Sequence, residues 1–517
     1  MKNIKIVSVI TAGLVTFSSC SKLDDKIYDA VATESLSSTG GKIDPATALN
    51  GVYTGLNDFS DQGGVYALME HPTDEMMGPT RGTDWDDFGV WRKLHQHTWD
   101  PLHQTVLDGW NRLNSNVFRA TQVITFAENN EQIKAEASFL RAFFMFHVMD
   151  LYGQVPFREA TDDPDANPKV FTRSEAFDFI EKDLLYAEEK LPNSTPDRAN
   201  KGAAEALLAK LYLNKAVYKA AAPSASYTFD KADMDKAIQY ANKVTDLGRY
   251  SLIGQGKYFD NFSWDNTNLS KELIFDVNNI EGAAKANARN RWRMVLHYSQ
   301  TPEGWNGFTT LADFYKSFEA GDERRGGAYP GMTDKIGLRV GFLVGQQYGP
   351  GNVALKDRSG NPLVFTEDVN LSYATEARGI RVIKYMPKPS ADNKVNDDNP
   401  GNDYIFLRYA DVVLMKAEAI FRGGTDTKGE TALGIVNNLR TLRGASALGN
   451  VGAPELLAER GRELYWEGWR RNDQIRFGTF NNPVDQRPNA SDPTKMLFPI
   501  PQRAIDTNPN LTQNPGY

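Results

Sequence analysis

Apolar residues recur every three or four positions in three stretches of the chain, which are residues 174–192, 201–219 and 234–247. In the first stretch, Phe177, Ile180 and Leu184 share this spacing, which places them on one side of an α-helix. The pattern therefore predicts three amphipathic helices, and Ser174 is the expected N-cap of the first.

Weaker patterns add further elements. More helices are predicted at residues 45–53, 110–151, 407–421, 431–442 and 454–469. Gly, Asp and Asn are frequent in the remaining parts, so we interpret these as loops with two short strands: loops at 60–105 and 253–400, strands at 273–277 and 381–385. The sequence predicts a mainly α fold in which tetratricopeptide-like helical pairs carry long, irregular, loop-rich insertions.

The N-terminal segment has the layout of an export signal. Two lysines precede an apolar stretch at residues 6–17, which is too short to span a bilayer, and Ser18 and Ser19 then precede Cys20. Small residues before the only cysteine predict cleavage before Cys20 and lipidation of its thiol, which would anchor the protein to a membrane. The alternative is an ordinary signal peptide in which Cys20 is incidental.

This interpretation divides the chain into three parts. We expect a signal peptide at 1–19, a lipidated cysteine with a flexible tether at 20–40, and a single domain at 41–517. Within that domain, we expect a helical half at about 41–250 and a loop-rich half with closing helices at about 251–517.

Composition excludes several classes of protein. Lys and Arg number 58 against 66 Asp and Glu, which gives a net charge of -8 and no basic excess for binding nucleic acid. A mean hydropathy of -0.49 argues against several membrane spans. One cysteine argues against a disulfide scaffold and against a cysteine-based zinc site.

Motifs spread along the chain resemble those of the SusD/RagB family of outer-membrane nutrient-binding lipoproteins. In chain order they are EASFLRA (136–142), YGQVP (152–156), LLAKLYL (207–213), LRYADV (407–412), ERGREL (459–464), FPIP (498–501) and NPNLTQNPGY (508–517). The resemblance covers the whole chain after residue 20.

The resemblance implies a function as well as a fold. It implies an all-helical domain with tetratricopeptide-like pairs, no catalysis and no required cofactor. It further implies capture of an oligosaccharide or polysaccharide at the outer face of the cell outer membrane. The partner would be a SusC-type TonB-dependent transporter.

Sugars stack their C–H faces on aromatic rings and exchange hydrogen bonds with charged side chains, so exposed Trp and Tyr residues are the first candidates for a binding site. Trp85 lies among Asp84, Asp86 and Asp87 in a loop, which is unusual for a core residue. Trp91, in the same stretch, is a second candidate.

The resemblance points to further candidates. It implies contacts by Asp74 and Arg81, although an internal salt bridge that fixes the loop would explain these two as well. It also implies binding aromatics at Tyr298 and Trp305, of which the latter is flanked by Gly304 and Asn306-Gly307. The final candidates lie around the Asn/Asp-rich loop at 392–403, and they are Arg378 and Tyr404.

Other functions remain open. The carboxylates near Trp85 could form a glycosidase pair, and His95 and His97 could bind a metal, but the spacing of known catalytic motifs is absent. Carboxylates of the 392–403 loop could hold a structural calcium ion, although a solvated loop without EF-hand spacing is favoured. A peptide-capturing RagB-like lipoprotein and a tetratricopeptide-type adaptor are the remaining alternatives.

Overall fold

The computed structural model describes residues 44–395 and 398–517. Cys20, the expected signal peptide and the expected tether lie outside the described residues. Residues Asp44–Tyr517 pack as one unit.

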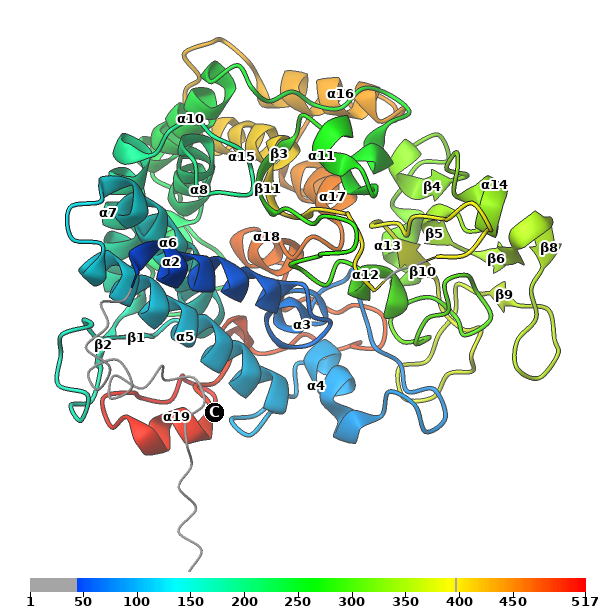
Figure 1. The fold of residues 1–517 in the computed structure, drawn as a ribbon, viewed down its shortest axis with the longest axis horizontal. Helices are drawn as coiled ribbons and strands as arrows, with labels where there is room; N and C mark the ends of the chain where they lie inside the picture. The colour runs from blue at the N-terminus through cyan, green and yellow to red at the C-terminus, as the bar shows by residue number, and fades with distance from the viewer. Residues whose placement is uncertain (1–43, 396–397) are drawn as a thin grey trace, which may run out of the picture. The chain divides into compact units, whose positions relative to one another are not determined.

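Helices build the first half of this unit (Figure 1). They are α2 (Pro45–Thr54), α3 (Gly64–Glu70), α4 (Val90–Gln96), α5 (Gln104–Phe126), α6 (Glu131–Tyr152), α7 (Arg173–Lys190), α8 (Lys201–Leu213), α9 (Lys215–Tyr218) and α10 (Lys231–Asp246). From α5 to α8 each helix packs on the next, and α10 packs on α8. This succession is consistent with the predicted tetratricopeptide-like pairs.

Short elements dominate the next part of the chain, and longer helices close it. The helices are α11 (Asn266–Leu269), α12 (Asn290–Arg293), α13 (Ala312–Lys316), α14 (Thr333–Ile336), α15 (Tyr409–Phe421), α16 (Ala432–Leu442), α17 (Ala453–Leu464), α18 (Arg470–Arg476) and α19 (Gln502–Thr507). α15 packs on α10 and also on α16 and α17, so the closing helices join the scaffold of the first half.

All strands of the described residues are short. They are β1 (Val155–Phe157), β2 (Lys169–Phe171), β3 (Leu273–Val277), β4 (Gly326–Gly327), β5 (Val340–Leu343), β6 (Gly345–Gln346), β7 (Tyr348–Gly349), β8 (Val353–Ala354), β9 (Val364–Phe365), β10 (Arg381–Ile383) and β11 (Tyr404–Arg408). Pairing is antiparallel throughout: β1 with β2, β3 with β11, β6 with β9, β7 with β8, and β5 between β4 and β10. Figure 1 shows β4 to β10 gathered away from α7, α8 and α10.

The predicted loop at 60–105 is wrong in two places, since it contains α3 and α4. All seven residues of α3 are buried, so no polar face marks the helix in the sequence. The predicted cap of α7 is also wrong. Thr172, two residues before Ser174, is the N-cap: its hydroxyl accepts from the Glu175 backbone N–H, and the Glu175 carboxylate accepts from the Thr172 N–H at 2.8 Å.

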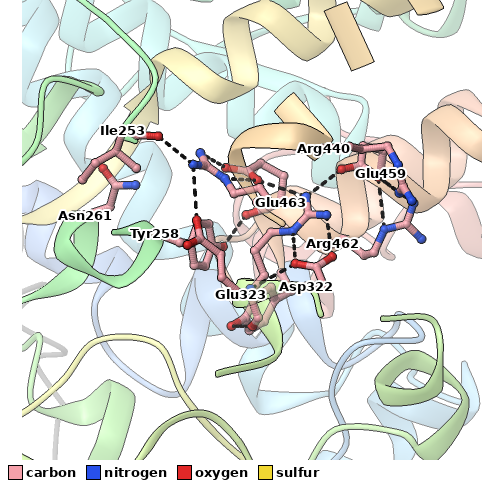
Figure 2. Close-up of polar contacts among 12 residues, drawn as sticks. Ile253, Tyr258, Asn261, Asp322, Glu323, Arg440, Glu459, Arg462 and Glu463 are labelled. Atoms are coloured by element: carbon pink, nitrogen blue, oxygen red, sulfur yellow. Dashed lines mark hydrogen bonds and ion pairs between the residues drawn. The ribbon is translucent and has the colours of Figure 1, made fainter. Parts of the chain in front are cut away.

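The ERGREL motif forms the centre of a buried ion network (Figure 2). On α17, Glu463 accepts from Arg408 at 2.8 Å, from Arg443 at 3.0 Å and from Arg324 at 3.1 Å. All four side chains are almost completely buried. Burial alone would raise the pKa of Glu463, but the three guanidinium groups hold it far below its usual value. The motif therefore fixes the scaffold.

Candidate ligand-binding site

A tight loop at residues 81–89 presents Trp85. Arg81 and Asp84 exchange backbone hydrogen bonds of 2.8 and 3.0 Å. Trp85 (φ 61°), Asp87 (φ 39°) and Phe88 (φ 54°) take left-handed backbone conformations. A left-handed conformation costs a non-glycine residue on the order of 1 kcal/mol, so the surrounding contacts must impose it on the loop.

A second loop at 296–308 presents Trp305. The Trp305 backbone N–H donates to the Arg293 carbonyl at 2.6 Å, and the Asn306 N–H donates to the Leu296 carbonyl at 2.8 Å. Gly304 makes this close return possible, because a Cβ at that position would lie 2.1 Å from the Leu296 oxygen. The side chain of Trp305 stays partly exposed.

The two loops meet although they are far apart in sequence. The Trp85 indole Nε1 donates to the backbone carbonyl of Trp305 at 2.9 Å. The Trp85 ring also lies against Gly307, where a Cβ would come within 2.6 Å of it, and against the Phe308 ring at 4.8 Å between centroids. The indole is thus fixed by main chain on one side and by core packing on the other.

Tyr298 joins this arrangement through polar contacts. Its hydroxyl donates to Asp84 Oδ2 at 2.9 Å, and the Arg358 guanidinium lies 4.2 Å from the centre of its ring. Burial and the Asp84 hydrogen bond raise the pKa of Tyr298 to about 12, so it remains a donor at neutral pH. Arg358 is in turn held by Glu376, which also contacts His297 at 3.1 Å.

We call Trp85, Tyr298 and Trp305 the aromatic patch. All three are partly buried, so each keeps part of its surface open to solvent. Asp84 and Arg358, both exposed, add a carboxylate and a guanidinium beside the rings. Ring surface next to charged hydrogen-bonding groups is the chemistry that a sugar requires.

Two further predicted residues support the patch from beneath. Arg81 is buried, and it donates to the carbonyls of Gly307 at 3.2 Å and Thr375 at 2.6 Å. Trp91 is 8% exposed and packs against Trp85, with the two rings tilted by 58° and 5.9 Å between their centroids. Both hold the loops in place and offer little surface to a ligand.

The structure does not bring the other predicted residues to the patch. Asp74 forms a two-pronged ion pair with Arg470 of α18, both contacts at 2.7 Å, so an internal salt bridge holds it. Tyr404 is 6% exposed on β11, and its hydroxyl donates to the Phe59 carbonyl. Arg378 is exposed and paired with Asp368.

Sequence reasoning missed Arg358 and Glu376 altogether. Arg358 lies in a turn at 357–361 that has no aromatic or glycine-rich signature, and only the fold brings it over Tyr298. No local signal in the sequence could have found this contact.

The residues considered for metal binding have other partners. His95 contacts the Asp485 carbonyl, and His97 contacts the Pro72 carbonyl and Ser491. Within residues 44–395 and 398–517, no three His, Cys, Asp or Glu side chains are grouped as metal ligands would be. Asp403, at the end of the 392–403 loop, lines a hollow of about 370 Å³ with Asp197 and Asp276 that lies apart from the aromatic patch.

Among the described residues, no helix combines the length and the apolar character that a membrane span requires.

Comparison with protein families gives two matches. The SusD family model matches residues 271–517, and a model described as "Starch-binding associating with outer membrane" matches residues 23–213.

Similar curated proteins include the starch-binding protein SusD of Bacteroides thetaiotaomicron. It is 27% identical to this chain, and the match covers 93% of the chain and 90% of the relative. SusD-like protein P2 of Formosa agariphila is 24% identical over the full length of both.

Solved structures share the fold at lower identity. A SusD superfamily protein from Parabacteroides distasonis matches with a TM-score of 0.71 and 20% identity, covering 92% of this chain and 98% of its own. Surface glycan-binding protein A from Bacteroides thetaiotaomicron, solved with laminarihexaose, matches with a TM-score of 0.67 and 19% identity, covering 91% and 98%.

Proposed function

Since this chain belongs to the SusD/RagB family, we propose that it is a non-catalytic lipoprotein that binds glycans at the cell surface. The observation that carries the proposal is the aromatic patch, where two loops 220 residues apart are joined by a hydrogen bond from Trp85 to the Trp305 carbonyl. The names of the relatives, which describe starch and glycan binding, support the same ligand class.

The proposed mechanism is capture and delivery. The patch holds a sugar chain by ring stacking and by hydrogen bonds to Asp84, Arg358 and Tyr298. A lipid at Cys20 would keep the protein on the outer membrane, and a SusC-type TonB-dependent transporter would accept the glycan. These two steps rest on the family resemblance and on the N-terminal sequence. The proposal requires neither a cofactor nor a covalent step.

The first test is binding to polysaccharides in gels. The full chain carrying Cys20→Ser would be run through gels that contain soluble starch, laminarin, xylan, mannan or polygalacturonate. We expect retardation by at least one glycan and about tenfold weaker binding in Trp305→Ala. Loss of one stacked ring with its buried surface is worth about 1–2 kcal/mol, and about 1.4 kcal/mol corresponds to tenfold.

A matched control is Trp264→Ala. Trp264 is also partly buried, but it packs on Tyr329, with 5.9 Å between ring centroids, outside the patch. It should bind as the unchanged chain does. A folded protein that no glycan retards would contradict the proposal, and the same chain should then be tested with peptides.

A further inference from the structure

We propose that Phe88 is a further glycan contact, an apolar ring that covers a sugar lying on the aromatic patch. This inference rests on the proposed function and names a residue that neither the sequence nor the family motifs single out. The side chain belongs to the same loop as Trp85, three positions further along the chain.

The first observation is exposure. Phe88 is 95% exposed, the highest value for a large apolar side chain among the described residues; Leu102 follows at 80% and Tyr373 at 72%. Burying a phenyl ring stabilises a fold, and Phe88 contributes none of this stabilisation to the free protein. Single exposed apolar residues are common, however, so exposure alone would not assign a role.

The second observation is that contacts on both sides of Phe88 hold its backbone in place. On one side, the Gly89 N–H donates to the Asp86 carbonyl at 2.5 Å. On the other, Asp87 accepts from the Trp91 indole at 2.6 Å, and Asp86 is paired with Arg92 at 2.6 Å. These contacts hold Phe88 at φ 54° and ψ 28°, a conformation unfavourable for a phenylalanine.

The ring that this strained backbone carries lies outside the core, as its exposure shows. Strain of this kind persists at ligand-binding loops because the surrounding structure imposes it. Because the backbone that carries the ring is already held, the loop loses little conformational freedom when a ligand arrives, so more of the contact energy appears as affinity.

The occupant follows from what else the loop presents. Trp85 is locked to the Trp305 carbonyl and lies beside Tyr298 through Asp84, so the neighbouring surface is the sugar-binding surface proposed above. Phe88 is then the element that can contact a ligand resting on that surface from its edge. This arrangement shields one sugar unit from water and strengthens its stacking.

The test compares Phe88→Ala, Phe88→Trp and Leu102→Ala in the Cys20→Ser chain, with laminarin and soluble starch as probes. We expect Phe88→Ala to bind about three- to tenfold more weakly and Phe88→Trp to bind at least as well as the unchanged chain. Leu102→Ala removes another strongly exposed apolar side chain outside the loop and should bind normally. All three should unfold at the unchanged temperature, because neither side chain packs on the core.

A second measurement reports on contact directly. Cys20 is the only cysteine, so Phe88→Cys in the Cys20→Ser chain carries a single thiol. We expect laminarin or starch, whichever binds, to slow its alkylation by iodoacetamide several-fold. Normal binding by Phe88→Ala together with unprotected alkylation overturns this inference alone. An unchanged chain that binds no glycan overturns the proposed function, and this inference with it.

Discussion

Glu70 is a carboxylate that the fold buries without full compensation. One of its oxygens accepts from the Gly468 backbone N–H at 2.5 Å, and the other has no hydrogen-bond partner. Burial raises the pKa of Glu70 to about 8, and burial together with Glu70 also raises the pKa of Glu75. The folded protein therefore keeps protons at neutral pH that the unfolded chain has already released.

This linkage predicts how stability depends on pH. A carboxyl group whose folded pKa lies above its unfolded value stabilises the fold at low pH and loses this contribution as pH rises, here between about 4.5 and about 8. The unfolding temperature of the unchanged chain should fall across this window. Glu70→Gln keeps the acceptor oxygen and removes the charge. The unfolding temperature of this variant should fall less steeply with pH, and at pH 8 it should be higher than that of the unchanged chain.

The control is Glu303→Gln, since Glu303 is exposed. It should follow the unchanged chain at every pH. Parallel curves for Glu70→Gln and the unchanged chain between pH 5 and pH 8 would show that Glu70 is ionised throughout this range in the folded protein.

At the scale of elements, α17 joins parts of the chain that are distant in sequence. Glu459 and Glu463 lie one turn apart on this helix, and both accept from Arg324, at 2.7 and 3.1 Å. Glu459 also accepts from Arg440 of α16 at 2.8 Å. The helix is therefore tied to the loop-rich half by charge as well as by packing.

Glu463→Gln should destabilise the protein strongly. The change removes the negative charge that Arg324, Arg408 and Arg443 share, and it leaves three buried cations with fewer counter-charges. Breaking a buried ion pair from one side costs roughly 3–5 kcal/mol. Denaturant unfolding measures the loss in the free energy of unfolding. The control is Glu189→Gln, which changes an exposed residue of α7 and should leave this free energy almost unchanged. A loss below about 1 kcal/mol would mean that the network contributes little to stability.

How well the sequence predicted an element depended on whether loop residues separate it from the next element. β3 occurs at the predicted residues Leu273–Val277, and α16 begins one residue after the predicted start. The helix predicted at 407–421 begins only at Tyr409, because Leu407 and Arg408 belong to β11, whose five residues are all buried. β11 continues directly into α15 without an intervening turn, so the sequence does not mark where the strand ends and the helix begins.

The candidate site was also predictable only in part. The sequence contains the reason to choose Trp85, a tryptophan among three aspartates, but it holds no sign that Trp85 contacts the Trp305 carbonyl. That contact depends on how the two loops are folded against the core. For the same reason, the burial of Tyr404 and the pairing of Asp74 with Arg470 could not be foreseen.

At the scale of the whole molecule, charge constrains the ligand. The chain carries a net charge of -8. The loop beside the patch carries three of the acidic residues, which are Asp84, Asp86 and Asp87. Arg358 does not balance all of this charge, because it is already paired with Glu376. Exposed charges within about 10 Å of a ligand act on it at physiological salt, so this surface disfavours acidic sugars.

Neutral glycans should therefore bind better than acidic ones. We expect laminarin or starch to retard the chain more than polygalacturonate does, and we expect binding of the neutral glycan to change less than twofold between about 50 mM and about 500 mM salt. Asp84→Asn, which preserves an acceptor for Tyr298, should raise the relative affinity for polygalacturonate. Stronger retardation by polygalacturonate at low salt would contradict this prediction.

The bond between Trp85 and residue 305 has a consequence for how such a site can diversify. Its acceptor is a backbone carbonyl, so the indole of Trp85 is held regardless of which side chain stands at position 305. Mutation can exchange the ring at 305 for another group, and so alter which ligand is preferred, while the opposite half of the site stays where it is. The side chain at position 305 thus sets which ligand is preferred, while its backbone carbonyl holds Trp85 in place. These two properties can therefore change independently in evolution.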